Sequence, residues 1–261
     1  MTINIPRYLS ENPGVDKVVV NQTWGLGDIL YIERIYAYLA GLGLRVIAPV
    51  QDQYVWIQEH IPYVDFRKQS EFAMDYERFD FGPLVADGKT QADTLYLPTR
   101  FSDQIHRGLM PHDSSASRYW MTDKYRVLGL DPSAWLGLTL VRNRGREEML
   151  KEMVLQDIEG DYDFCNLSYH NMNNHRLSPS LIRGSGRPMV EMRRIDGYTM
   201  VDWSGVIEGA RSVHTVSTSV LYMVHPLHRP GVDFHLYPRL PETGFYTVED
   251  FLPGYWKKES P

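Results

Sequence analysis

The chain has 261 residues, of which 43% are hydrophobic and 23% charged, so it is an ordinary folded protein with room for one large domain or two smaller ones. The formal net charge of −6 is shared evenly, with 13 basic and 16 acidic groups in residues 1–130 and 14 and 17 in residues 131–261. This distribution argues against a domain that binds duplex nucleic acid through its phosphates. A single cysteine excludes an internal disulfide, and neither a signal-peptide pattern nor an apolar run of membrane-spanning length is present. We therefore expect a cytoplasmic protein without a membrane partner.

The first half of the chain opens with a strand, a glycine turn, a helix and a second strand. Residues 17–21 and 45–50 are short β-branched runs typical of buried strands. Between them, apolar residues recur at helical spacing over residues 29–40, and Gly41 and Gly43 are typical stop signals. Parallel strands joined in this way place their loops at the carboxyl edge of the sheet, where ligands bind.

The patterns become weaker toward the middle of the chain. We predict a helix over 54–60 and a strand over 63–66. Over residues 70–125 we expect irregular loops with one or two short elements, including a helix near 119–128. Residues 130–133, Leu-Asp-Pro-Ser, have turn chemistry and predict a domain boundary.

A second series of elements fills the rest of the chain, so the pattern predicts two α/β halves, residues 1–130 and 131–261. Its predicted elements, in chain order, are a strand over 138–141, a helix over 147–154, strands over 162–167 and 188–192, a helix capped by Asp202, a strand over 212–216 and a helix from Thr218.

The turn Gly25-Leu26-Gly27-Asp28 is the first candidate for a functional site. A glycine turn between a strand and a helix exposes backbone N–H groups at the positive end of the helix, so an anion or a hydroxyl group can approach closely. The alternative is that Asp28 is an ordinary N-cap. A dinucleotide site would need a third glycine where the chain has Leu30, which disfavours NAD.

The second candidate is the end of the predicted strand over 212–216. Its hydroxyl-bearing residues are Thr215, Ser217, Thr218 and Ser219, and they lead into a predicted helix. Hydroxyl groups and free N–H groups at a helix start suit a phosphate or a pyrophosphate. A Ser/Thr capping cluster is the alternative interpretation.

A basic stretch follows the predicted strand over 162–167. Arginine is suited to bidentate contacts with phosphate, and polar residues directly after a strand often face a ligand. The members of this stretch are His170, Arg176, Arg183, Arg187, Arg193 and Arg194. Solvated surface arginines are the alternative for any one of them.

Other chemistries lack their residue patterns. The nine histidines show no H-E-x-x-H motif, and one cysteine cannot build a structural zinc site, so no metal site is predicted. The chain has no G-x-S-x-G elbow and no P-loop, so hydrolase and P-loop functions have no support.

Two stretches together resemble the heptosyltransferase-like glycosyltransferases of the GT-B type. The stretch VVVNQTWGLGDILYIERIYAYLAGLGLRVIAPV is similar to their amino-terminal unit, in which a G-D-[IV]-L turn follows the first strand. The stretch DWSGVIEGARSVHTVSTSVLYMVHPL is similar to their carboxyl-terminal domain, where a polar turn holds the phosphates of the nucleotide sugar. The family usually has an acidic residue and a Gly-His pair in that turn, whereas this chain has Val216-Ser217-Thr218-Ser219 and is shorter than a typical member.

The resemblance implies an α/β fold with two Rossmann-like domains facing across a cleft, a compact GT-B arrangement. Residues 1–130 would bind the acceptor and residues 131–261 the nucleoside-diphosphate sugar, with a UDP-sugar expected as co-substrate and neither cofactor nor metal. Asp28 matches the residue proposed as base in that family. The donor contacts would come from Gly25, Gly27, His170, Arg176, Arg183, Thr215, Ser217, Thr218 and Ser219.

Several alternatives stay open at this point. The acceptor hydroxyl could belong to a glycan, a small molecule or a hydroxymethylated pyrimidine in DNA, because compact GT-B enzymes of viral origin modify phage DNA in the host cytoplasm. A Rossmann-like methyltransferase would need an acidic residue at the end of the second strand, and Asp52 comes late for that role. A third alternative is a fold of this type that binds nucleotide sugars without catalysis.

Overall fold

The computed structural model describes residues 4–21, 25–71, 83–86, 89–98, 116–168, 182, 186–238 and 247–259. The chain divides into two compact units, unit 1 (Met1–Val141) and unit 2 (Arg142–Pro261). The boundary predicted at residue 130 falls inside unit 1, because the 3-10 helix η3 (Pro132–Gly137) buries Trp135 against Tyr31, with 6.2 Å between ring centroids. In the described part of the chain, no helix has the length and apolar character needed to cross a membrane.

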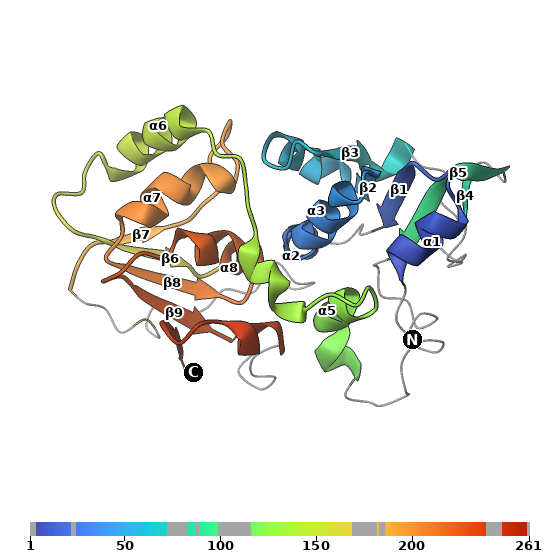
Figure 1. Ribbon diagram of the computed structural model, residues 1–261. Coiled ribbons are helices and arrows are strands. Elements are labelled where there is room, and N and C mark those ends of the chain that lie inside the picture. The colour runs from blue at the N-terminus through green and yellow to red at the C-terminus, as the bar shows by residue number, and fades with distance from the viewer. Residues whose placement is uncertain are drawn as a thin grey trace. The chain divides into compact units, whose positions relative to one another are not determined.

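Unit 1 is built on a five-stranded sheet with the order β3-β2-β1-β5-β4 (Figure 1). The central strand β1 pairs in parallel with β2 and β5, β2 pairs in parallel with β3, and β4 is an antiparallel edge strand. The strands are β1 Lys17–Asn21, β2 Arg45–Val50, β3 Val64–Lys68, β4 Pro83–Ala86 and β5 Lys89–Pro98. The helical elements are α1 Ile5–Glu11, α2 Leu26–Tyr31, α3 Glu33–Gly41, η1 Asp52–Glu59, η2 Gln69–Glu71, α5 Ala116–Arg126 and η3.

The expected strand–turn–helix–strand unit is present, with one change. The strands over 17–21 and 45–50 have the predicted bounds, but the predicted helix over 29–40 is two helices, α2 and α3, with a break at Ile32. Ile32 is both the C-cap of α2 and the N-cap of α3. The helix predicted over 54–60 is the 3-10 helix η1.

The strand β5 was missed, although it lies beside β1 in the sheet. Its first half is polar, Lys-Thr-Gln-Ala-Asp, and gives no apolar periodicity. Residues 94–97 are buried, and Tyr96 pairs with Val19 of β1 in the parallel register. The prediction of a largely irregular stretch over 70–125 was therefore wrong for this strand.

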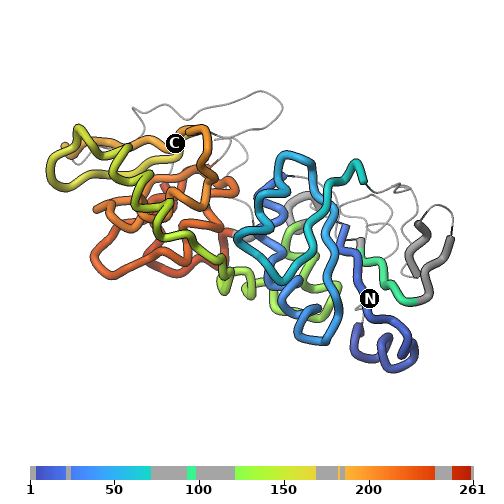
Figure 2. Tube along the Cα trace, turned by 90° about the horizontal axis from the view of Figure 1, so that it is seen from above, coloured from blue at the N-terminus to red at the C-terminus, as the bar shows by residue number. Residues whose placement is uncertain are grey.

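Unit 2 contains a second five-stranded sheet, with the order β10-β9-β8-β6-β7, and all its pairings are parallel (Figure 1). The strands are β6 Asp163–Asn166, β7 Met189–Glu191, β8 Ser212–Val216, β9 Asp233–Tyr237 and β10 Trp256–Lys258. The helical elements are α6 Arg144–Leu155, η5 Val201–Trp203, α7 Ser204–Gly209, α8 Ser219–Val224, η6 His225–Leu227 and η7 Thr247–Phe251. The trace of Figure 2 follows these elements through each unit in chain order.

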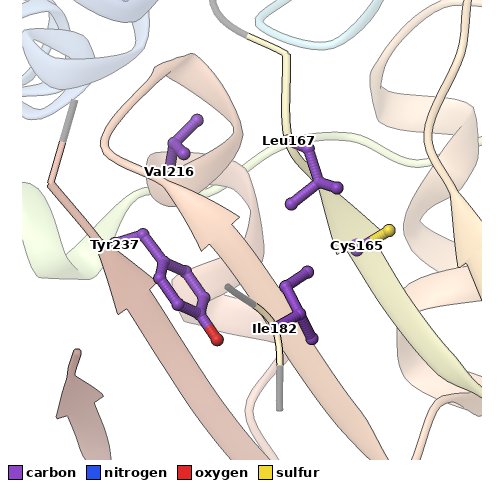
Figure 3. Close-up of a cluster of buried hydrophobic side chains, with 5 residues drawn as sticks. All are labelled: Cys165, Leu167, Ile182, Val216 and Tyr237. Carbon is purple, nitrogen blue, oxygen red and sulfur yellow. The ribbon is translucent and has the colours of Figure 1, made fainter. Parts of the chain in front are cut away.

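One face of the second sheet carries a small apolar cluster (Figure 3). Cys165 and Leu167 from β6 and its end, Val216 from β8 and Tyr237 from β9 lie together with Ile182, and all five are buried. The lone cysteine is thus a core residue. Its burial fits the small apolar role that free cysteines commonly have.

Two local expectations for unit 2 and the segment before it were wrong. Residues 138–141 form no strand, and Val141 instead exchanges two 2.8 Å hydrogen bonds with His60, one to the backbone and one to the imidazole Nδ1. Asp202 does not cap a helix: the N-cap of α7 is Trp203, and the Asp202 carboxylate accepts hydrogen bonds from Arg146 and Thr199.

A close contact between the end of α7 and Tyr162, the residue before β6, depends on the absence of a side chain at Gly209. A Cβ atom there would lie 2.2 Å from the hydroxyl oxygen of Tyr162 and 3.2 Å from its Cζ atom. That hydroxyl group is buried and donates a 2.6 Å hydrogen bond to the carbonyl of Val206. A side chain at Gly209 would therefore displace the phenol hydroxyl that makes this hydrogen bond.

We expect Gly209→Ala to destabilise unit 2 by about 2 kcal/mol. Overpacking costs about 1–3 kcal/mol and a buried hydrogen bond about 1 kcal/mol, while the better helix propensity of alanine returns about 1 kcal/mol. Gly145→Ala is the matched control, because its Cβ would lie 3.6 Å from the nearest atom, Asn143 Oδ1, an ordinary contact. Urea unfolding measures both variants, and equal midpoints would contradict this account of the contact.

Candidate functional site

The order in which the chain adds strands to the first sheet reverses beside β1. From β1 the chain builds β2 and β3 on one side, and it later returns to place β5 on the other side. In open α/β sheets, ligands bind outside the carboxyl ends of the strands at such a switch point. Here those ends are Asn21 on β1 and Pro98 on β5, and the buried Asn21 amide donates a hydrogen bond to the hydroxyl of Tyr96.

The predicted glycine turn lies at this switch point, after the end of β1. Gly25 is the N-cap of α2 and makes no side-chain cap, and Gly27 and Asp28 lie in the first turn of that helix. The amide of Asp28 donates a 3.0 Å hydrogen bond to the carbonyl of Gly25. Asp28 is therefore not the N-cap, and its carboxylate is free of the capping role that was its alternative interpretation.

The carboxylate of Asp28 pairs with a buried lysine that the sequence did not single out. Lys124 on α5 places its Nζ atom 2.9 Å from Asp28 Oδ1. The Lys124 side chain is 2% exposed and that of Asp28 is 14% exposed, so Asp28 is the member of the pair that solvent reaches. Burial lowers the pKa of Lys124 from its ordinary value, and the nearby carboxylate opposes that shift.

A second buried carboxylate lies on the following helix. Glu33 of α3 accepts hydrogen bonds from the hydroxyl groups of Tyr63 and Thr139. Burial raises the pKa of Glu33, and the Tyr63 hydrogen bond opposes that shift. Because Glu33 is buried, it is less accessible to a ligand than Asp28.

The second sheet has its own switch point between β6 and β8. From β6 the chain first places β7 on one side and then β8 on the other. The carboxyl ends of these two strands carry Asn166 and the Ser/Thr turn that follows Val216. The side-chain amide of Asn166 donates to Thr218 Oγ1 at 3.2 Å and to Thr215 Oγ1 at 3.4 Å. The second predicted turn therefore also lies where a parallel α/β sheet binds ligands.

The four hydroxyl groups of this turn fall into two pairs. Thr215 is 0% exposed and donates to the carbonyl of Val216, and Ser217 is buried and donates to the carboxylate of Glu249. Thr218 and Ser219 are partly exposed, and Thr218 is the N-cap of α8. Thr218 and Ser219 can thus touch a ligand, whereas Thr215 and Ser217 support the turn from inside.

His214 precedes these hydroxyl groups on β8. Its ring stacks on that of His235 with 4.4 Å between centroids, and its two ring nitrogens lie near the hydroxyl groups of Ser212 and Tyr237. Burial lowers the pKa of His214 to about 4. The imidazole is therefore neutral at pH 7 and is part of the sheet's core.

The members of the predicted basic stretch differ in where the structure places them. His170, Arg176 and Arg183 lie outside the described residues. Arg187 pairs with Asp163 at the amino end of β6, with 2.8 Å between Nε and Oδ1, so it lies at the edge of the sheet opposite the Ser/Thr turn. Arg193 and Arg194 are exposed and follow the carboxyl end of β7.

Three residues of these sites were missed by sequence reasoning. Lys124 gave a signal, because it lies beside the buried stripe of Met121, Tyr125 and Leu128 where an apolar residue is expected. Asn166 gave one too, as a polar residue that ends an apolar strand. Glu249, whose carboxylate accepts a hydrogen bond from Ser217, gave no signal in the sequence.

The methyltransferase alternative depends on an acidic residue at the end of the second strand of the first sheet. Asp52 begins η1 after the end of β2, and its carboxylate accepts hydrogen bonds from Ser70. Within the part of the chain that the structure describes, no group of three or more His, Cys, Asp or Glu side chains is arranged to hold a metal ion.

Comparisons with known proteins give matches at the level of structure. No family model matches the chain, and no curated protein does. The glycosyl transferase family 9 structure from Veillonella parvula DSM 2008 superposes with a TM-score of 0.55 at 10% identity, over 94% of this chain and 86% of that chain. TibC, an iron-containing dodecameric glycosyltransferase from enterotoxigenic E. coli H10407, superposes with a TM-score of 0.50 at 10% identity, over 94% of this chain.

The TibC complex with ADP-D-beta-D-heptose, described as a heptosyltransferase, gives a TM-score of 0.50 at 10% identity over the whole of this chain and 64% of that one. This chain thus spans less than two thirds of TibC, 63% in the first of the two TibC structures. At such identities the likeness concerns the fold. The chain has an α/β fold of two units, each with a mainly parallel sheet, that is typical of GT-B-like glycosyltransferases.

Proposed function

We propose that the chain is a glycosyltransferase that moves a sugar from a nucleoside diphosphate to a hydroxyl group. One observation carries the proposal: each α/β unit places one of the two predicted polar turns at the switch point of its own sheet, within a glycosyltransferase-like fold. In this proposal unit 1 binds the acceptor and unit 2 binds the donor.

The donor's diphosphate would bind at the turn after β8. Thr218 Oγ1 accepts hydrogen bonds from Asn166 and from the amide of Val220, which occupies both of its acceptor positions. The hydroxyl hydrogen of Thr218 is then directed to a further acceptor, such as a phosphate oxygen. The Ser219 hydroxyl would donate a second hydrogen bond to the diphosphate, and Thr215 and Ser217 would hold the turn in shape.

Positive charge for the diphosphate would come from His170, Arg176 and Arg183, which follow β6 in the chain. Arginine binds phosphate oxygens with two parallel hydrogen bonds, and such contacts stabilise a leaving diphosphate without a metal ion. Independence from metal is therefore part of the proposal. At the first turn, Gly25 and Gly27 would let a ligand approach the backbone.

Asp28 would act as the general base. The acceptor hydroxyl attacks the anomeric carbon, its proton passes to the Asp28 carboxylate, and the bond between that carbon and the diphosphate oxygen breaks with its electron pair leaving on the diphosphate. Asp28 suits this role because its carboxylate lies at the switch point and is partly exposed.

For the donor, a UDP-sugar is the expectation that accompanies the family resemblance, and the ADP-heptose in the TibC complex makes an ADP-sugar the second donor to test. The acceptor would be a glycan, a small molecule or a hydroxymethyl group in DNA. A DNA acceptor would need a local basic surface, and the exposed Arg193 and Arg194 are the described residues that would contribute to it.

A panel of nucleotides tests this function. UDP, ADP and GDP are titrated into the full chain by calorimetry, and the corresponding nucleotide sugars are then assayed for release of the diphosphate to water or to an acceptor. We expect one nucleotide to bind and its sugar to be turned over. In Thr218→Val that nucleotide should bind about tenfold more weakly, because a hydrogen bond to a charged group is lost.

Thr139→Val in unit 1 is the matched control and should bind the nucleotide as tightly as the wild type does. If a nucleotide binds but its sugars are never turned over, the chain is a nucleotide-sugar-binding protein instead. If no nucleotide binds, unit 2 is not a donor domain.

A further inference from the structure

The pairing of Asp28 with Lys124 goes beyond what the glycine turn by itself provides. The two residues are far apart in the chain and come from different helices, α2 and α5 of unit 1. The ammonium nitrogen of Lys124 lies 2.9 Å from Oδ1 of Asp28, and its side chain is 2% exposed. Burying an ammonium group costs free energy because the group loses its hydration, so its buried position calls for a specific role.

The contact distinguishes the two oxygens of the carboxylate. Lys124 binds Oδ1, whereas Oδ2 lies on the side of the glycine turn, 3.9 Å from the position that a Cβ on Gly25 would take. Among the described residues, no hydrogen bond to Oδ2 is present. One oxygen is thus fixed by the protein, and the other is directed toward the turn at the carboxyl end of β1.

Docking of α5 onto α2 has other causes. The hydroxyl of Tyr125 donates a hydrogen bond to the carbonyl of Tyr31, and the two rings pack edge to face with 5.2 Å between centroids. Met121 and Leu128 are also buried on α5 and after its end. An apolar residue at position 124 would suit that packing at least as well as a buried ion pair, which often contributes little net stability.

We infer that Lys124 is a positioning residue for Asp28: its ammonium group holds Oδ1, so that Oδ2 is the atom presented to the acceptor hydroxyl. This inference rests on the proposed function, in which Asp28 takes the acceptor's proton. Oδ2 then receives that proton as the new carbon–oxygen bond forms and the bond to the diphosphate breaks. Lys124 acts through Asp28 and does not itself touch the substrate.

The variants Lys124→Met and Tyr125→Phe separate this role from a structural one. Methionine keeps the length of the side chain and removes its charge, whereas Tyr125→Phe loosens the attachment of α5 and leaves the ion pair in place. We expect Lys124→Met to lower kcat for the nucleotide sugar that is turned over by about 10- to 100-fold with an unchanged donor KM. Tyr125→Phe should unfold at a lower temperature and keep its kcat, and Lys124→Arg should recover part of the lost rate.

A measurement without turnover completes the test. Crystal structures of the wild type and of Tyr125→Phe should show one orientation of the Asp28 carboxylate, and that of Lys124→Met should show a rotated or divided one. A single unchanged orientation in Lys124→Met would overturn the inference. So would an unchanged kcat in Lys124→Met, or an equal loss in Tyr125→Phe. If Asp28→Asn keeps full turnover, it is the proposed base that fails, whatever Lys124 does.

Discussion

Asp28→Asn is expected to lower turnover of the nucleotide sugar by about 10²- to 10⁴-fold, the range that a positioned general base contributes. Asparagine has the same shape but cannot accept the acceptor's proton. The donor binds in unit 2 in our proposal, so its KM should stay within about twofold of the wild-type value. Steady-state kinetics at several donor concentrations measure both quantities.

Two controls distinguish a loss of catalysis in Asp28→Asn from a loss of folding. Asp28→Asn leaves the buried charge of Lys124 without its carboxylate, so part of any effect will be on stability, which thermal unfolding of each variant reports. Asp16→Asn is the matched control, since its carboxylate is 72% exposed and lies 3.7 Å from the Nζ atom of Lys17. Turnover by Asp28→Asn at the rate of that control would contradict the base assignment.

Asp202→Ala is expected to destabilise unit 2 by about 3 kcal/mol, because a buried carboxylate with several partners is removed. Asp202 is 1% exposed and accepts hydrogen bonds from Arg146 at 2.8 and 3.2 Å and from the backbone and hydroxyl of Thr199 at 2.6 and 3.0 Å. The Arg146 side chain is 30% exposed, so water can partly replace the lost carboxylate and limits the cost.

The exposed pair of Asp161 and Arg211 offers a matched control in the same unit. These side chains are 56% and 55% exposed and lie 2.9 Å apart, so Asp161→Ala should cost less than about 1 kcal/mol. Urea unfolding followed by tryptophan fluorescence, to which the buried Trp203 of unit 2 contributes, compares the two variants. Equal losses for Asp202→Ala and Asp161→Ala would show that burial of the carboxylate is not what gives this contact its strength.

Where local chemistry decides the fold, the sequence was informative. The strands over 17–21, 45–50 and 212–216 have the predicted bounds, because each is a short run rich in β-branched residues. Thr218 begins its helix as an N-cap, as Ser and Thr commonly do. By contrast, β5 depends on its neighbours: half of its residues are polar, and the sheet rather than the local pattern makes them a strand.

The candidate sites show the same difference between features set by local sequence and features set by long-range packing. The two polar turns could be predicted, since strand, turn and helix signals are local. Their partners could not, because Lys124 meets Asp28 and Asn166 meets Thr218 only after distant segments have packed. The hydroxyl of Ser217 was assigned to the donor, but in the structure it binds Glu249, a residue from the far end of the chain.

The late position of β5 in the chain also shapes how unit 1 can form during synthesis. Its partner β1 is made near the start, and the register pairs Val19 with Tyr96, so one edge of β1 stays open until residues 94–98 have left the ribosome. An unpaired apolar edge strand is a site of aggregation, and the wait lasts several seconds at usual rates of translation of about 5–20 residues per second. Nascent chains that end before β5 should therefore need chaperone protection that complete chains do not.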